Sequence, residues 1–100
     1  MSRTIVFAAA LAAALSAHAQ ENGRNLAAGC AICHGTLGKP APGAPLIPLA
    51  GLPQDHIATQ MRAFRDGKRP ATIMHQLAKG YTEQQIELVA DFFSRQSPAR

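Results

Sequence analysis

One pentapeptide, Cys30-Ala31-Ile32-Cys33-His34, constrains this chain more than any other feature, because it contains both of its cysteines. A disulfide between residues three positions apart closes a very small loop, which restricts the unfolded chain only weakly. A thioredoxin-like redox pair needs a βαβ context, and the sequence shows none. Structural zinc needs four ligands, and His56 and His75 lack the spacing that would complete such a site.

The remaining interpretation of the pentapeptide is the attachment signal for a c-type haem. On one helical turn, two thiols can reach both vinyl groups of a porphyrin, while the adjacent imidazole turns under the iron. The motif therefore predicts one covalent haem held by Cys30 and Cys33, with His34 as an axial ligand of the iron.

Length and composition agree with a small domain built around a prosthetic group. The chain has 100 residues, which leaves no room for an α/β nucleotide-binding unit with its own substrate domain. With no Trp, one Tyr and four Phe, its side chains bury little apolar surface, so a bound group should help to fill the core. The formal charge of +4 comes from dispersed basic residues with few aromatic neighbours, which gives little support to nucleic-acid binding.

The first 19 residues are typical of a secretory signal peptide. Arg3 precedes an uninterrupted apolar run from Ile5 to Leu15, and Ala17-His18-Ala19 has the small-x-small pattern of a cleavage site. The apolar run is far shorter than the roughly 20 residues that span a bilayer, so stable membrane insertion is not expected. We expect an exported, periplasmic chain in which residues 20–100 form a single domain.

Apolar periodicity and turn residues predict an all-α fold of about four helices. A proline-rich loop over residues 35–51 should wrap around the haem, because its prolines and glycines are compatible with neither a helix nor a central strand. Gly80 should end the third helix in a left-handed conformation. Thr82 and Gln85 predict a capping box at the start of the last helix. The expected helices cover residues 22–31, 53–65, 71–79 and a final segment from Thr82 that ends before Pro98.

The second axial ligand has four candidates: Met61, Met74, His56 and His75. Met61 falls on the apolar stripe of the second helix and is expected to pack in the core, while His56 is expected to be a solvated surface residue. Met74 follows a turn that can direct its thioether to the side of the haem opposite His34. His75 would point about 100° further round a helix and remains the alternative ligand.

Three segments resemble the cytochrome subunit of flavocytochrome c sulfide dehydrogenase, a class I c-type cytochrome. The haem motif is common to all c-type cytochromes, whereas the Arg-Pro-x-Thr-x-Met run followed by Ala-Lys-Gly-Tyr-Thr is much more specific. The resemblance covers nearly all of the mature chain and implies Met74 as the distal ligand. The three matching segments are residues 26–38, 64–70 and 72–82.

The chain departs from this family in two places. Class I cytochromes orient the proximal imidazole through a hydrogen bond to a proline carbonyl, and the prolines of this loop are shifted, which leaves Pro45 as the candidate acceptor. The first helix has Ala27 near the place where relatives carry an aromatic residue. Phe92 or Phe93 of the last helix must therefore find another contact.

With both axial positions filled, the expected function is electron transfer rather than catalysis on this chain. The resemblance implies that a separate flavin-bearing chain oxidises sulfide and that this haem passes the electrons on to other exported redox proteins. Two alternatives remain open. One is a diffusible monohaem cytochrome that donates to a terminal oxidase or reductase, using a basic rim of Arg62, Arg65, Lys68, Arg69 and Lys79. The other is a haem sensor or gas-binding module.

Overall fold

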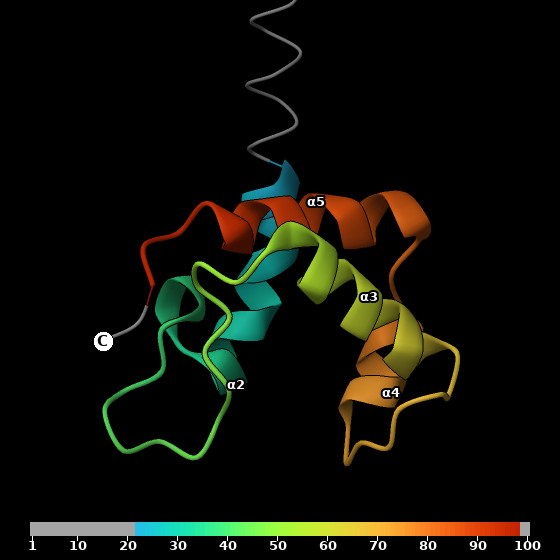
Figure 1. The fold of residues 1–100 in the computed structure, drawn as a ribbon, viewed down its shortest axis with the longest axis horizontal. Coiled ribbons are helices and arrows are strands. Elements are labelled where there is room, and N and C mark those ends of the chain that lie inside the picture. The colour runs from blue at the N-terminus through green and yellow to red at the C-terminus, as the bar shows by residue number, and fades with distance from the viewer. Residues whose placement is uncertain (1–21, 99–100) are drawn as a thin grey trace, which may run out of the picture.

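The computed structural model describes residues 22–98, and the expected signal peptide lies outside them. All regular structure in this range is helical, which confirms the all-α fold (Figure 1). No helix within it is both long and apolar enough to cross a membrane. Residues 22–27 are helical, and the elements that follow are η1 (Ala28–Cys30), α2 (Ala31–His34), η2 (Thr36–Gly38), α3 (Gln54–Arg65), α4 (Met74–Ala78) and α5 (Glu83–Ser94).

Most predicted helix boundaries are confirmed to within one or two residues, and the differences have local causes. The first helix continues past its expected end through a tighter turn, η1, into α2. Helix α4 begins only at Met74, because Ile73 has an extended φ of −139°. Gly80 is not among the described glycines with positive φ, so the predicted left-handed stop is wrong. Instead, the chain makes two successive turns, each closed by a backbone hydrogen bond that the amide of Gly80 or of Tyr81 donates, and then enters α5 directly.

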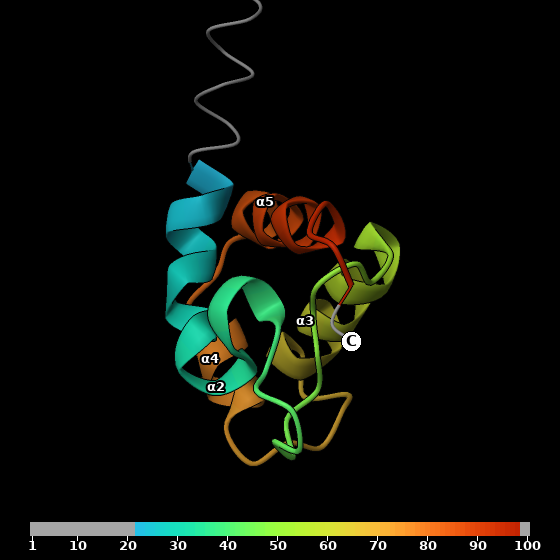
Figure 2. The ribbon, with the colours of Figure 1, turned by 90° about the vertical axis from the view of Figure 1, so that its left-hand side faces the viewer.

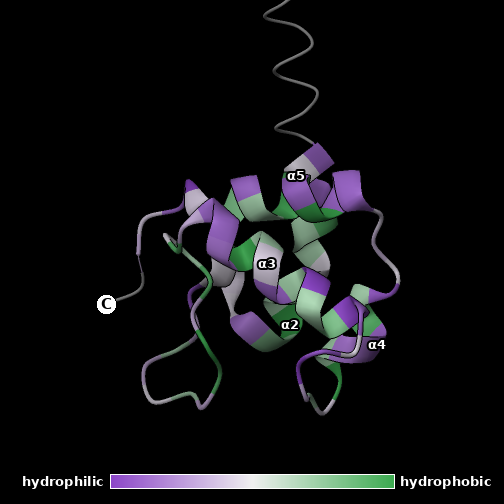
Figure 3. Ribbon diagram, turned by 45° about the vertical axis from the view of Figure 1, so that its right-hand side comes forward, coloured by the Kyte–Doolittle hydropathy of each residue, from purple (hydrophilic) through white to green (hydrophobic). Residues whose placement is uncertain are grey.

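The core lies between α3 and α5, which pack against each other (Figures 1 and 2). The hydrophobic residues of α5 face α3, and polar residues cover its outer side (Figure 3). The largest fully buried side chains are Phe93 and Ile86, both from α5. Helix α3 adds Ile57, Ala58 and Met61 to the same cluster.

Close backbone approaches replace the aromatic contact that the first helix lacks. A Cβ atom on Gly23 would lie 2.9 Å from the Leu88 carbonyl oxygen, so this glycine lets the first helix pack directly on α5. A Cβ atom on Gly38 would lie 2.9 Å from the Phe93 ring, and the Gly38 φ of +76° also favours glycine. Phe93 thus finds its contact on η2, and its ring meets that of Phe92 edge-on at 5.3 Å.

Charged residues fasten the outer edges of the same helix pair. Glu83 accepts from Arg62 at 2.9 Å and from Arg65 at 2.7 Å, and Arg62 also pairs with Glu87. The predicted capping box is present, with Thr82 and Gln85 exchanging side-chain hydrogen bonds with each other's backbone amides. These arginines and acids hold α3 to α5 from outside the apolar contact.

The other end of the molecule carries the segments that the sequence singled out. Helices α2 and α4 and the loops of residues 39–53 and 66–73 lie below α5 in Figures 1 and 2, which share a vertical axis. We call this region the α2–α4 end.

Candidate haem-binding site

The two cysteines and the histidine lie on consecutive turns of the same helical segment. Cys30 ends η1, and Cys33 and His34 close α2. Both thiols are free, Cys30 half-buried and Cys33 exposed. Helical geometry therefore presents two thiols and an imidazole from one short stretch of chain, the donor set that thioether attachment of a porphyrin requires.

The orientation of His34 is fixed by the loop that follows. Its Nδ1 lies 2.8 Å from the carbonyl oxygen of Ile47. Because a carbonyl can only accept, Nδ1 carries the proton, and the lone pair of the neutral ring is left on Nε2, where a metal ion can bind. The acceptor is Ile47 and not Pro45, so the predicted acceptor is wrong by two positions.

The physical reason lies in how the loop is anchored. The Gly38 carbonyl accepts from the amide of Leu49 at 2.9 Å and from that of Ala50 at 3.1 Å, which pins the returning chain beside η2. Ile47, two residues before this anchor, is thereby brought to the imidazole. Since Pro48 follows Ile47, the extended conformation favoured before proline suits an outward-turned carbonyl.

The four candidates for the second ligand are separated by burial. Met61 is 8% exposed and belongs to the core, whereas His56 is exposed on the first turn of α3. Met74 opens α4, packs against the core cluster and remains partly exposed. His75, the next residue, has a buried Nδ1 without a hydrogen-bond partner. The structure thus leaves a thioether and an imidazole side by side at the start of α4.

The α2–α4 end also carries the large apolar side chains that are exposed in the described residues. Ile32 is 90% exposed between the two cysteines. The others are Leu46, Ile47, Ile73 and Leu77, from the two loops and α4. A porphyrin has large apolar faces, so apolar side chains next to its ligands suit such a group. The thiols, the free Nε2 and these side chains together fit a covalently held haem.

The local environment of the Cys30 thiol favours its protonated form. Burial raises the pKa of Cys30, the neighbouring Cys33 raises it further, and a hydrogen bond with Tyr81 partly opposes them. Burial likewise raises the pKa of the Tyr81 phenol.

Sequence reasoning missed two groups, and neither had a strong signal. The Ile47 carbonyl is a backbone atom, so no residue type marks it among the loop positions. The Tyr81 hydroxyl donates to the Leu26 carbonyl at 3.3 Å and tethers the first helix near Cys30. The sequence does show that Tyr81 directly precedes the capping box, but a residue at that position is expected only to make an apolar contact.

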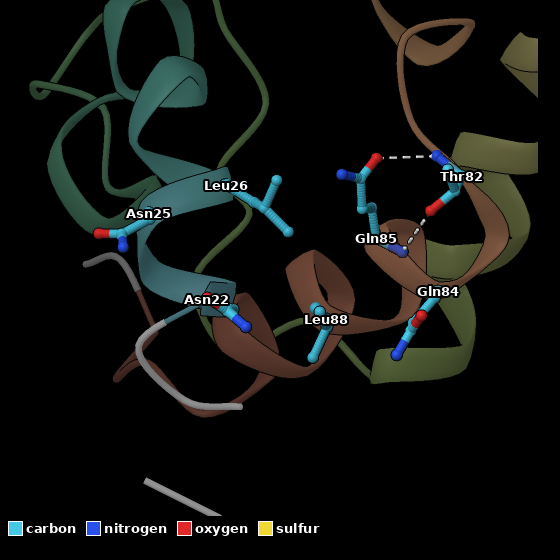
Figure 4. A pocket seen from close by; sticks show the side chains of 7 residues that line it. All are labelled: Asn22, Asn25, Leu26, Thr82, Gln84, Gln85 and Leu88. Carbon is cyan, nitrogen blue, oxygen red and sulfur yellow. Dashed lines mark hydrogen bonds between the residues drawn. The ribbon is translucent and has the colours of Figure 1, made fainter. Parts of the chain in front are cut away.

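A depression of about 500 Å³ lies elsewhere, between the first helix and the start of α5 (Figure 4). Asn, Gln and Thr side chains line most of it, with Leu26 and Leu88. None of the candidate haem ligands contributes to it, so this depression is separate from the candidate site.

Comparison with curated proteins gives consistent names. The chain is 37% identical over 78 residues to the cytochrome subunit of sulfide dehydrogenase from Chlorobaculum tepidum, covering 78% of this chain and 69% of that protein. It is 40% identical over 75 residues to the thiosulfate dehydrogenase electron acceptor of Thiomonas intermedia, covering 73% of this chain but only 34% of the relative. A cytochrome c-552 of Acidithiobacillus ferridurans is 38% identical over 65 residues, covering 65% of this chain and 27% of its own length. No protein-family model matches the chain.

Proposed function

This chain belongs to the c-type cytochromes of the kind that serves as the cytochrome subunit of sulfide dehydrogenase, and we propose that it carries electrons in the periplasm through one covalent haem ligated by His34 and Met74. The observation that carries the proposal is the hydrogen bond from His34 Nδ1 to the Ile47 carbonyl, which leaves Nε2 free one residue after the second thiol.

Each part of the candidate site has a distinct task in this proposal. Cys30 and Cys33 would hold the group as thioethers, and the Ile47 carbonyl fixes the ring plane of His34 and the nitrogen that carries its proton. Met74 supplies a thioether that favours ferrous iron and raises the reduction potential relative to a second imidazole. When bound, the haem supplies a reversible one-electron iron couple. If His34 and Met74 both held the iron, no position would remain open for a substrate.

The ligand set is tested on the mature chain expressed with a c-type maturation system. We expect red protein that keeps its colour after denaturation and extraction with acidic organic solvent, and a near-infrared thioether-to-iron band in the oxidised form. The variant Met74→Ala should lose this band, and its potential should fall by about 100 mV or more, within the ~0.8 V range that axial ligands set. Met61→Leu is the matched control and should keep both. A native protein without the band would assign the position to His75.

The partner we propose is a dehydrogenase of a reduced sulfur compound, in the first place a flavoprotein that oxidises sulfide. The name of the C. tepidum relative refers to a sulfide dehydrogenase and that of the T. intermedia relative to a thiosulfate dehydrogenase, which supports a dehydrogenase partner. Sulfide oxidation would then belong to the separate flavin-bearing chain, and this chain would accept the electrons and pass them to another exported redox protein.

Copurification distinguishes a lasting subunit from a diffusible carrier. Expressed with its native neighbours, a subunit should elute with a flavoprotein at equal amounts of haem and flavin, whereas a lone monohaem peak would contradict the subunit assignment. Carbon monoxide tests the third possibility. Rapid binding to the reduced protein at neutral pH would show that Met74 does not hold the iron and would favour a gas-binding module.

A further inference from the structure

Helix α3 ends in a turn that fastens the following loop to its own last residues. Gly67 has a φ of +73°, and its amide donates to the Phe64 carbonyl at 3.2 Å. The Ala63 carbonyl accepts from the amide of Lys68 at 2.9 Å and from that of Arg69 at 3.3 Å. In such a glycine-ended cap, amides just beyond the helix bond back to carbonyls of its last turn. The backbone is therefore fixed to α3 as far as Arg69.

The side chain of Arg69 also turns back to α3 and contacts it twice. Its guanidinium carbon lies 4.7 Å from the centre of the Phe64 ring, and the guanidinium donates to the side-chain oxygen of Gln60. Gln60 and Phe64 are four residues apart, so they lie on one face of the helix. Phe64 in turn packs against the core cluster. Two neutral groups of α3 thus hold the guanidinium.

These contacts distinguish Arg69 from the neighbouring basic residues. Arg62 and Arg65 form ion pairs with Glu83 on α5. Within residues 22–98, neither Lys68 nor Arg69 belongs to an ion pair, and Lys68 is exposed whereas Arg69 is half-buried. A planar guanidinium stacks on an aromatic ring and donates several hydrogen bonds in a fixed geometry, which a lysine ammonium cannot reproduce. The position therefore uses the shape of arginine as well as its charge.

Helix α4, which follows the loop, has few means of fixing its own start. It has five residues, and Ile73 before it makes no side-chain capping hydrogen bond. A helix this short is not stable by itself, so its place depends on contacts with the rest of the fold. Ala78 is fully buried and fixes its last turn. The first residue, Met74, is only partly buried and depends on how the loop of residues 66–73 delivers it.

We propose that Arg69 is a positioning residue for the distal haem ligand: by holding the loop of residues 66–73 to α3, it keeps the Met74 sulfur where it can stay on the iron. This inference rests on the proposed function, which makes Met74 that ligand. Pro70 directly follows the held residue, and its fixed φ limits the directions in which the chain can continue toward α4. Without the guanidinium contacts, only backbone hydrogen bonds at the end of α3 would hold the loop, and Met74 would leave the iron more often.

Cyanide binding to the ferric holoprotein tests the proposal. Cyanide reaches this iron position only after the protein's own ligand has left, so its rate constant reports how often Met74 leaves. We expect Arg69→Gln to raise this rate constant about tenfold, because a cation–π contact and a hydrogen bond from a charged donor are both lost. Arg69→Lys keeps the charge but not the planar geometry and should raise it less.

Lys68→Gln is the matched control, because it removes the same charge from the adjacent, exposed side chain. Its cyanide rate constant should equal that of the wild-type protein. An unchanged rate constant in Arg69→Gln, or an equal increase in Lys68→Gln, would overturn the proposal.

A second readout separates a local effect on Met74 from a general loss of stability. Urea should abolish the near-infrared thioether-to-iron band of Arg69→Gln at concentrations at which circular dichroism still reports intact helices. Phe92→Ala weakens the packing of α5 instead, and its two midpoints should lie as close together as those of the wild-type protein. If the two midpoints of Arg69→Gln lay equally close, Arg69 would only support the fold and the proposal would be wrong.

The proposed function and this inference fail in different ways. A wild-type protein without the near-infrared band would refute Met74 as the ligand, and both proposals would fall. A wild-type protein with the band, together with an Arg69→Gln variant that has the wild-type cyanide rate constant and urea midpoints, would refute only the role of Arg69.

Discussion

The α3–α5 pair and the α2–α4 end are stabilised in different ways. The helix pair buries Phe93 and Ile86, pairs its surface charges across the interface and caps α5 with a complete reciprocal box. The α2–α4 end has short helices, exposed isoleucines and long connecting loops. The α3–α5 pair forms a core from its own side chains. The α2–α4 end instead has exposed apolar side chains of the kind that line a binding site.

This difference reflects where the few large apolar residues of the chain lie. A small domain buries a modest fraction of its surface, so a core large enough for two regions cannot be built from the three Phe of residues 22–98 and no Trp. The α3–α5 pair contains most of these residues and positions the ends of α3 and α4. The proposed haem would supply the apolar surface at the other end.

The largest effect is expected from removing the two cysteines that we propose hold the haem. We expect the double variant Cys30→Ala with Cys33→Ala to yield no covalently coloured protein, and to lower the free energy of unfolding by about 4 kcal/mol or more, as loss of a tightly bound ligand does. Haem staining of a denaturing gel and urea unfolding followed by circular dichroism measure the two effects. Cys33→Ser should keep one thioether and most of the stability. A colourless double variant as stable as the holoprotein would show that the α2–α4 end needs no cofactor.

Phe93→Ala tests the other region and should cost about 3 to 5 kcal/mol, because it opens a cavity where α5 meets η2. Denaturant unfolding of the holoprotein measures the loss. Phe92→Ala removes a neighbouring, partly exposed ring and should cost clearly less. If the two variants lost the same amount, the Phe93 contact with Gly38 would not be the link between the regions.

Thr82→Ala should lower stability by about 1 kcal/mol, because one helix-end amide loses its acceptor. Thr82→Ser keeps the acceptor oxygen and should restore most of the loss. If Thr82→Ala had the same free energy of unfolding as the wild-type protein, solvent would satisfy this amide equally well.

The smallest effect is expected at Glu83, whose pKa is lowered, chiefly by hydrogen bonds from Arg62 and then from Arg65. A carboxylate with a folded-state pKa below the ordinary value of 4.5 stabilises the fold at pH values above that value, and the contribution is lost as the pH falls through the folded pKa. The Tm difference between the protein and Glu83→Gln should therefore be largest at neutral pH and should shrink on acidification. Asp55→Asn leaves the ion pairs of Glu83 intact and should show no such trend. A Tm difference for Glu83→Gln that grew at low pH would contradict the prediction.

Much of the fold was predictable because its signals are local. The capping box at Thr82 and the apolar stripe through Met61 each follow from residues close in sequence, and the structure confirms them. The start of α4 and the conformation of Gly80 were less predictable, since they depend on how the chain enters and leaves a five-residue helix.

The candidate site divides in the same way. Cys30, Cys33 and His34 follow from a motif, because side-chain chemistry fixes their spacing. The hydrogen-bond acceptor of His34 does not, because any carbonyl of a proline-rich loop has the same chemistry and only the anchor at Gly38 decides which one reaches the ring. The distribution of ion pairs was equally hidden, since Arg62 and Arg65 meet Glu83 only after α3 and α5 have packed.

The double anchor at the Gly38 carbonyl has a consequence for how such a protein can diversify. Because the two ends of the loop are joined there, the intervening residues form a closed excursion whose length matters little to the helices behind it. The segment can thus be exchanged as a cassette that carries both the acceptor for His34 and exposed apolar side chains. A single graft between related chains would change the two together, while the supporting scaffold stays the same.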